Sequence, residues 1–199
     1  MRTIDGHTYD NDLLSKSNGW IIDAGARGFN FSDEMLSYGR EVYSLDIEKF
    51  DTEYRACFVF KHAALMAKSG NVEAHYFGNG TANFIKGLNE QPYNGPDRPC
   101  ETKAVKAITL QDIYAEIGTD IDLLKLDIEA AEYEILANIE PIPKQITVEF
   151  HEHSNPVLHK KWINHVLTHL GKHYYFNLYV REWPLYLFMD CLFIRKDLL

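Results

Sequence analysis

The chain has 199 residues, which is enough for one α/β domain with a sizeable core and too few for two ordinary domains. Its 20 Lys and Arg stand against 29 Asp and Glu, a formal charge of −9 that disfavours contact with phosphate backbones, so we expect no nucleic-acid partner. Cys57, Cys100 and Cys191 are widely spaced and odd in number, which favours free thiols in a reducing compartment.

No apolar run approaches the roughly 18 residues that a membrane-spanning helix needs, and the first residues lack a basic segment followed by an apolar stretch. We therefore expect a cytoplasmic protein without a membrane partner. We treat 1–199 as a single domain, in which the polar residues 1–19 form an N-terminal extension with one short helix over 10–17. Nothing in these residues indicates a role for the extension.

The first half of the domain alternates strands with turns and one helix. Trp20 to Asp23 predicts a strand, and a glycine turn leads from it into a helix over about 31–38, which Gly39 ends. Further strands are expected over 42–46, 55–60 and 72–77. The link over 47–54 is shorter than the dozen residues that a parallel crossover usually needs. Residues 87–99 are rich in Gly, Pro, Asn and Asp and predict a surface loop able to order over a site.

The second half continues the alternation and closes on two long β runs. Helices are predicted over 110–117, where Thr109 is the N-cap and Gly118 the end, over 129–138, and over 156–170. Strands are predicted over 121–127, 145–150, 173–181 and 185–195, the last two joined at Trp183-Pro184 as an antiparallel hairpin. The chain is thus expected to be α/β, with a mainly parallel twisted sheet, helices on both faces and an antiparallel pair at one edge.

One candidate ligand site follows the first strand. Asp23-Ala24-Gly25-Ala26-Arg27-Gly28 has two glycines three apart, which allow a tight turn and a close approach of the backbone to a ligand. Asp46 ends the second strand about 20 residues later, where a carboxylate can accept hydrogen bonds from both ribose hydroxyls. The alternative is an ordinary tight turn and a surface carboxylate.

A second candidate site follows the strand over 121–127. Lys125, Asp127 and Glu129 alternate along its tip and Glu132 follows, so several charges share one side of the chain. The alternative is that the two glutamates only favour the start of a helix, with Lys125 as their ion-pair partner. Asp127 is harder to explain in that way, because a charge that ends an apolar strand needs a partner.

The next strand ends in the same manner, with Glu149, His151 and His153 expected on one face of an extended chain. A histidine there can take up a proton near neutral pH, although a hydrogen-bonded structural histidine explains it equally well. His165 and His169 have helical spacing, but no acidic or cysteine partner completes a metal set, so we expect a solvated helix face there.

These segments together resemble the FkbM-type methyltransferase family over roughly Trp20 to His151. The resemblance is carried by Ile22 to Ala26 with Ser32, the acidic tip at Asp46, Ala63 to Leu65, Thr109 to Asp112, Ile121 to Leu136 and Val148 to His151. Lys-x-Asp-x-Glu-x-x-Glu-Tyr-Glu-x-Leu, which begins at Lys125, is its most specific part. The chain departs from the family at Arg27, at Phe29 directly after Gly28, at Asp46-Ile47 and at Ala130.

The resemblance implies a Rossmann-like class I methyltransferase that uses S-adenosylmethionine, with O-methylation of a hydroxyl on a sugar or small metabolite. Carried over by position, it implies a cofactor site, and it marks the acidic tip and the neighbouring strand end as the reaction site. The cofactor-binding candidates are Asp23, Gly25, Ala26, Arg27, Gly28 and Asp46, and the catalytic candidates are Asp127, Glu129 and His151. We expect His151 to be the better proton acceptor near pH 7.

Three other hypotheses remain open. A divalent ion held by Asp127, Glu129 and Glu149 is possible on chemical grounds, but the expectation is that no metal is resident. A protein that keeps the fold and binds a ligand without turnover is suggested by Arg27 and Ala130. A nicotinamide-dependent oxidoreductase is disfavoured, because the turn lacks the third glycine of the dinucleotide pattern. The oligomeric state is not predicted, since Trp183 and Tyr186 fit either a dimer contact or a core.

Overall fold

The structure is a computed structural model that describes residues 1–51, 55–77, 83–88, 100–151, 156–183 and 186–199, the last two ranges in part through the backbone alone. Most of the predicted loop over 87–99, the Trp183-Pro184 join, His153 and the side chains of Trp183 and Tyr186 therefore lie outside the described side chains. No helix in the described part of the chain combines the length and the apolar character that crossing a membrane demands.

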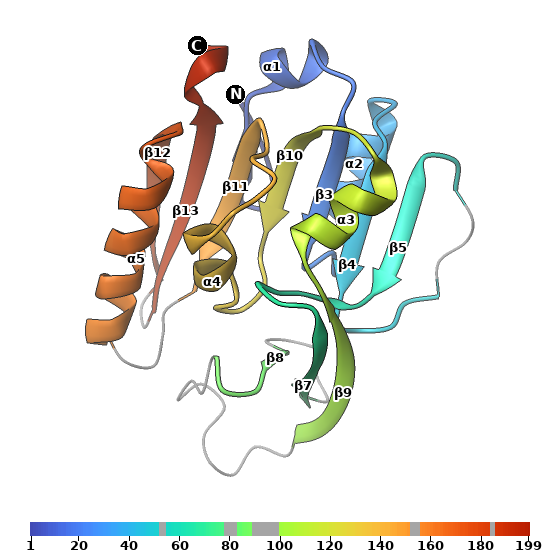
Figure 1. Ribbon diagram of the computed structural model, residues 1–199, viewed down its shortest axis with the longest axis vertical. Helices are drawn as coiled ribbons and strands as arrows, with labels where there is room; N and C mark the ends of the chain where they lie inside the picture. Colours follow the sequence, from blue (N-terminus) through green and yellow to red (C-terminus); the bar gives the residue numbers. More distant parts are fainter. Residues whose placement is uncertain (52–54, 78–82, 89–99, 152–155, 184–185) are drawn as a thin grey trace.

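The fold is built around a mixed seven-stranded sheet (Figure 1). Along the sheet the order is β12 (Tyr174–Trp183), β13 (Tyr186–Arg195), β11 (Gln145–Phe150), β10 (Ile121–Leu126), β3 (Trp20–Ala24), β4 (Val42–Asp46) and β5 (Phe58–His62). The five strands from β11 to β5 are parallel to one another, whereas β13 pairs antiparallel with both β11 and β12. The α/β class and the mixed sheet agree with the pattern predicted from the sequence.

The order of the strands creates a topological switch point between β3 and β10. From β3 the chain runs outward through β4 to β5, and it later returns to β10 on the other side of β3. Where the order reverses in this way, the carboxyl ends of the two central strands are not covered by their own connections, so ligands bind there. The register sets Lys125 beside Asp23 and Leu126 beside Ala24, which brings the two predicted sites together.

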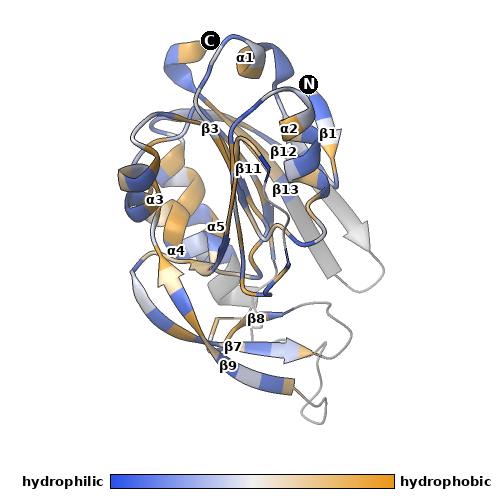
Figure 2. Cartoon of the chain, turned by 90° about the vertical axis from the view of Figure 1, so that its right-hand side faces the viewer, coloured by the Kyte–Doolittle hydropathy of each residue, from blue (hydrophilic) through white to orange (hydrophobic). Residues whose placement is uncertain are grey.

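Helices cover both faces of the sheet, and the pleat divides the core accordingly. On one face Ile22, Leu124 and Val148 pack with α3 (Leu110–Ile117), α4 (Glu132–Ala137) and α5 (Pro156–Leu170) (Figure 2). Ile21 and Leu123, next along their strands, face the other way and pack with α1 (Asn11–Ser15) and α2 (Asn30–Ser37). These alternating buried side chains hold the strand tips of the site in fixed positions.

The N-terminal extension has a structural role that the sequence did not indicate. Residues Arg2–Ile4 (β1) and His7–Tyr9 (β2) form a two-stranded antiparallel hairpin before α1, hereafter the N-terminal hairpin. All three residues of β2 are buried, and Tyr9 packs edge-on against Phe31 of α2. The N-terminal hairpin therefore lies on the same face of the main sheet as α2 and places His7 in the interior.

A second, smaller sheet lies beyond the carboxyl ends of the parallel strands (Figure 1). Its strands are β6 (Ala64–Leu65), β9 (Cys100–Ile108), β7 (Gly70–Phe77) and β8 (Phe84–Ile85), in that spatial order. Only β7 agrees with a strand predicted from the sequence. Val105 and Ala107 of β9 are buried while Lys106 between them is exposed, which is the alternation of a strand covered on one side.

Two predicted boundaries were wrong. The helix expected over 129–138 begins at Glu132, because Glu129 and Ala130 have φ values of 53° and 78°, a left-handed conformation that an α-helix cannot contain. The strand expected over 55–60 spans Phe58–His62, since its register is set by pairing with β4, from Val42–Phe58 to Asp46–His62. The short link after Asp46 has no helix in its described residues, 47–51 and 55–57.

Candidate functional site

Gly25 is the closest point of contact between the tips of β3 and β10. Its φ is +79°, and a Cβ at this position would lie 1.9 Å from the carbonyl oxygen of Asp127. Only glycine fits such an approach. The backbone N–H of Asp127 donates to the carbonyl oxygen of Ala24 at 3.1 Å, so the two segments predicted from the sequence as separate ligand-binding tips form one wall.

A buried ion pair lies directly beneath this wall. Nζ of Lys125 lies 3.1 Å from Oδ1 of Asp23 and donates to the carbonyl oxygen of Gly25 at 2.6 Å. Oδ2 of Asp23 accepts a hydrogen bond from Ser32 Oγ at 2.6 Å. Burial alone would lower the pKa of Lys125, but Asp23 and Asp127 raise it, so the ammonium stays charged. Lys125 is thus the partner of these two aspartates, not of Glu129 and Glu132 as the alternative hypothesis held.

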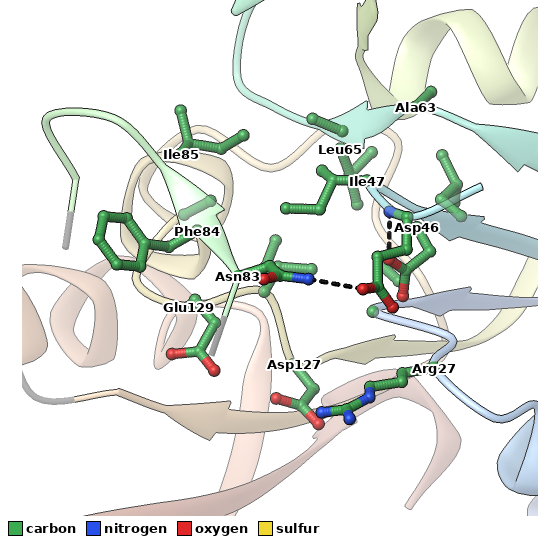
Figure 3. Close-up of a pocket in the computed structure, with 17 residues that line it drawn as sticks. Arg27, Asp46, Ile47, Ala63, Leu65, Asn83, Phe84, Ile85, Asp127 and Glu129 are labelled. Carbon is green, nitrogen blue, oxygen red and sulfur yellow. Dashed lines mark hydrogen bonds between the residues drawn. The ribbon is translucent and has the colours of Figure 1, made fainter. Parts of the chain in front are cut away.

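A concavity at the strand tips, hereafter the strand-tip cavity, has a volume of about 160 Å³ (Figure 3). Apolar side chains of the two sheets form much of it, among them Ile47, Leu65, Phe84 and Ile85. Its charged residues are Arg27, Asp46, Glu48, Asp127 and Glu129. An apolar slot with a few convergent polar groups is the usual form of a small-molecule site.

Asp46 contributes a buried carboxylate to the strand-tip cavity. Oδ1 of Asp46 accepts a hydrogen bond from the backbone N–H of Glu48 at 2.7 Å, and Asn83 Nδ2 donates to Glu48 Oε1 at 2.8 Å (Figure 3). Burial raises the pKa of Asp46 to about 6, above its ordinary range. The carboxylate lies where the ribose-binding acid was predicted.

A second concavity of about 190 Å³, hereafter the hairpin cavity, lies between the N-terminal hairpin and the glycine turn. Asp5 and His7 line it from the hairpin, and Asp23, Ala26 and Lys125 line it from the sheet. Gly25, Arg27 and Asp127 line both cavities, which are therefore adjacent. Arg27 and Gly28 are exposed, and Gly28 lines neither of the two cavities.

His7 reaches Asp127 from the N-terminal hairpin. Its side chain is 1% exposed, and Nε2 lies 3.5 Å from Oδ2 of Asp127. Neither ring nitrogen hydrogen-bonds to a residue in the described part of the chain. Burial opposes the charge of Asp127, yet Lys125 and the two histidines His7 and His151 keep the pKa of this carboxyl below its usual range.

His151 lies among four carboxyl groups at the end of β11. Nδ1 lies 3.0 Å from Glu132 Oε1, and Nε2 faces Glu149 at 3.4 Å, Asp127 at 3.5 Å and Glu129 at 3.7 Å. Burial lowers the pKa of His151, but Glu129 and Glu132 raise it well above the ordinary value. A ring that is already protonated at neutral pH cannot accept a proton, which argues against His151 as the base.

Glu129 is better suited than His151 to accept a proton. Its side chain is 25% exposed and lines the strand-tip cavity, where burial raises the pKa of its carboxyl. A raised pKa makes a carboxylate a better proton acceptor near neutral pH. Of the three predicted catalytic residues, Glu129 therefore has the electrostatic setting that best suits a base.

The catalytic candidates predicted from the sequence omitted two residues of this cluster: Glu132, which was named only as part of the Lys125 motif, and His7, which was not named. Glu132 is fully buried, and its Oε1 also accepts a hydrogen bond from the backbone N–H of Ile128 at 2.9 Å. The position of Glu132 in the Lys125 motif could have marked it as a site residue, whereas nothing in the sequence around His7 marks that histidine. The ligand atoms of Asp127, Glu149 and His151 lie within 4.8 Å of one another, a potential metal-ligand group that differs from the predicted one in having His151 in place of Glu129.

Residues 28–174 match the family model described as the methyltransferase FkbM domain. The matched residues make up well over half of the chain and include the acidic segment at Lys125 and the tip of β11. None of the curated proteins compared with the chain matches it. The resemblance predicted from the sequence is confirmed, and the chain belongs to the FkbM methyltransferase family.

Proposed function

We propose that the protein is an S-adenosylmethionine-dependent O-methyltransferase with a Rossmann-like class I fold, and that it acts on a hydroxyl of a sugar or small metabolite. The observation that carries this proposal is the junction of the two cavities at Gly25, Arg27 and Asp127. A cofactor with a nucleoside at one end and an amino acid at the other suits two adjacent compartments of different chemistry.

The donor set of each compartment supports this assignment. In the strand-tip cavity, Asp46 offers an acceptor for ribose hydroxyls, and Ile47, Phe84 and Ile85 offer an apolar surface for a base. The hairpin cavity has carboxylates at Asp5 and Asp23 and cations at Arg27 and Lys125, which suits the opposite charges of an amino acid. A dinucleotide pyrophosphate would meet these carboxylates, which disfavours the oxidoreductase hypothesis.

The bound cofactor would supply an electrophilic methyl group on a positively charged sulfur. Asp127 lies at the junction of the cavities and its carboxyl is ionised, so it stabilises positive charge at that position. Glu129 takes the proton of the acceptor hydroxyl. The strand tips hold the reactants in line, which is the main source of acceleration in a displacement of this kind.

Calorimetric titration with S-adenosylmethionine and S-adenosylhomocysteine tests the proposal, with Asp46→Ala as the variant. Binding by the wild type that the variant loses is the expected result, and methylation of hydroxylated acceptors is then measured. Absence of binding by the wild type would remove the proposed activity.

A ligand-binding protein without turnover is the second candidate. The strand-tip cavity, at about 160 Å³, is smaller than the roughly 300–1,000 Å³ of typical ligand pockets, which favours a smaller ligand. Cofactor binding without methyl transfer to any of a broad set of hydroxylated acceptors would support this candidate. A cytosolic location and a small-molecule acceptor remain predictions in either case.

A further inference from the structure

Three side chains from two neighbouring strand ends converge beside the strand-tip cavity, and one of them, Asp127, lines it. Asp127 follows β10, and Glu149 and His151 are at the end of β11. One ligand atom from each lies within 4.8 Å of the other two. Because the two strands are paired in parallel, the convergence is fixed by the sheet itself.

The distances around His151 Nε2 are longer than those of charge-assisted hydrogen bonds. Glu149 Oε1 lies at 3.4 Å and Asp127 Oδ1 at 3.5 Å, longer than the 2.7–2.9 Å of a charge-assisted hydrogen bond. Two ligands that each lie ~2.1–2.2 Å from one ion, at angles of 90–110°, are roughly 3.0–3.6 Å apart. The spacing of these two pairs of atoms thus also suits ligands that share a cation.

His7 provides an independent observation on the other side of Asp127. It is a buried imidazole whose ring nitrogens have no hydrogen-bond partner in the described residues, and Nε2 faces Asp127 Oδ2, while Oδ1 faces His151. An imidazole that faces one oxygen of a carboxylate leaves the other oxygen for a metal, which is a common arrangement of outer-shell partners at metal sites. Glu132 has the corresponding place at His151. Its Oε1 lies 3.0 Å from Nδ1, and Nε2, the other ring nitrogen, faces Asp127 and Glu149.

We propose that Asp127, Glu149 and His151 form a binding site for one divalent transition-metal ion such as Mn²⁺. Two carboxylates and an imidazole favour such an ion over Mg²⁺, which prefers oxygen ligands and water. Only a neutral imidazole binds a metal, so the ion would displace the proton from Nε2 of His151 as it binds. Three protein ligands leave coordination positions for other oxygens. The side chain of Asp127 is 35% exposed, so the site is open toward the cavity.

The site also points to a class of acceptor, an inference that rests on the proposed function. A hydroxyl with a neighbouring oxygen, as in a vicinal diol or a hydroxy acid, would fill two of the open positions at once. Coordination lowers the pKa of the hydroxyl, and its proton passes to the carboxylate of Glu129 as the O–H bond breaks. The new O–C bond then forms as the S–C bond of the cofactor breaks.

The test is a Mn²⁺ titration of the chelator-treated protein, followed by the electron paramagnetic resonance signal of free Mn²⁺. The wild type should bind one ion, and Glu149→Gln should weaken binding tenfold or more, since its side chain is 19% exposed and the change preserves shape. His7→Ala should weaken binding about tenfold through Asp127. Glu134→Gln, on the exposed side of α4, is the matched control and should bind as the wild type does.

Either of two results would overturn the site: no bound Mn²⁺ in the wild type, or equal affinity in Glu149→Gln and Glu134→Gln. Titration of the metal-free protein with S-adenosylhomocysteine separates this proposal from the proposed function. Cofactor binding without Mn²⁺ binding removes the metal site and keeps the methyltransferase. Mn²⁺ binding without cofactor binding keeps the site and removes the methyltransferase.

Discussion

His7 and Asp127 are in contact, with Nε2 of the histidine 3.5 Å from Oδ2 of the aspartate. The first belongs to the N-terminal hairpin and the second to the tip of β10. Through this contact a segment outside the family match, which begins at residue 28, reaches the centre of the candidate site. The position of Asp127 therefore depends on the hairpin as well as on its own strand.

We expect His7→Ala to reduce kcat about tenfold, because Asp127 loses the imidazole that faces its Oδ2, and to weaken S-adenosylhomocysteine binding, because His7 also lines the hairpin cavity. Steady-state kinetics and calorimetry measure the two effects. Thr3→Ala, which removes only the Thr3–Thr8 hydroxyl contact of the same hairpin, should leave kcat unchanged. Equal losses in the two variants would mean that the hairpin acts only through stability.

Glu129→Gln should lower kcat about 100-fold without weakening cofactor binding, since the amide cannot take the acceptor proton. In the wild type, burial raises the pKa of Glu129, so kcat should rise with pH through a value above the usual range of a glutamate. The rate of Glu129→Gln should lack this rise. A variant that keeps the full rate and the same profile would place the base elsewhere.

Asp46 should make the protein less stable as pH rises. Its pKa is about 6 in the folded state against an ordinary value of 3.8, so the folded protein binds more protons than the unfolded chain between these values. Stability from this group is therefore greatest at low pH and is lost as pH rises through 6. Asp46→Asn should raise the free energy of unfolding at pH 7.5 by roughly 1–3 kcal/mol, since the shift corresponds to about 3 kcal/mol at most.

The same substitution should weaken S-adenosylhomocysteine binding, because the ionised carboxylate is the stronger acceptor for ribose hydroxyls. Urea unfolding and calorimetry at pH 5 and pH 7.5 measure both quantities. Asp33→Asn, at an exposed ion pair with Arg55, is the control and should show neither effect. A stability that rises between pH 5 and 7.5 in the wild type, but not in Asp46→Asn, would contradict the prediction.

Gly25→Ala should cost several kcal/mol, since the new Cβ would lie 1.9 Å from the carbonyl oxygen of Asp127 and φ is +79°. Gly118→Ala separates the two causes, because Gly118 has a φ of +68° and nothing within 4 Å of its Cβ position. It should lose only about 1–2 kcal/mol through backbone strain. Chemical denaturation measures the stability of both variants. Equal losses of stability would show that the contact between residue 25 and the carbonyl oxygen of Asp127 adds no steric cost.

Lys125→Met should destabilise the protein by about 3–5 kcal/mol, because Asp23 would become a buried charge without its cation. Adding Asp23→Asn should recover part of this loss, since the remaining pair of side chains is neutral. Urea unfolding of both single variants and the double variant gives the coupling energy. Strict additivity would show that the two side chains act independently.

The sequence was sufficient for the strand tips, because an apolar run that ends in charge marks a buried parallel strand by composition alone. Asp46 and Gly25 were identified in this way, whereas the contact of the Asp127 segment with the first turn was not predicted. The alternation around Val105 was present in the sequence but was not used, so β9 was missed. Helix α4 was placed three residues early, because left-handed backbone at Glu129 and Ala130 leaves no mark in residue type.

The charge of His151 and the place of His7 could not be predicted, for one physical reason. Each depends on which side chains from distant segments surround it, and a single sequence contains no such distances. His151 was expected to be a base because isolated histidines titrate near pH 7, but four neighbouring carboxyl groups alter that. His7 lay in a segment without any pattern, and only the fold brings it to Asp127.

The family match begins at residue 28, after β3 has already ended. A fragment trimmed to those limits would lack strand β3, the Asp23 partner of Lys125, and His7, which faces Asp127. Domain-boundary design or chimera building on this scaffold should therefore start ahead of the hairpin. If such a shortened fragment were inactive, the missing strand would explain the inactivity, and the result would say nothing about the chemistry of the family.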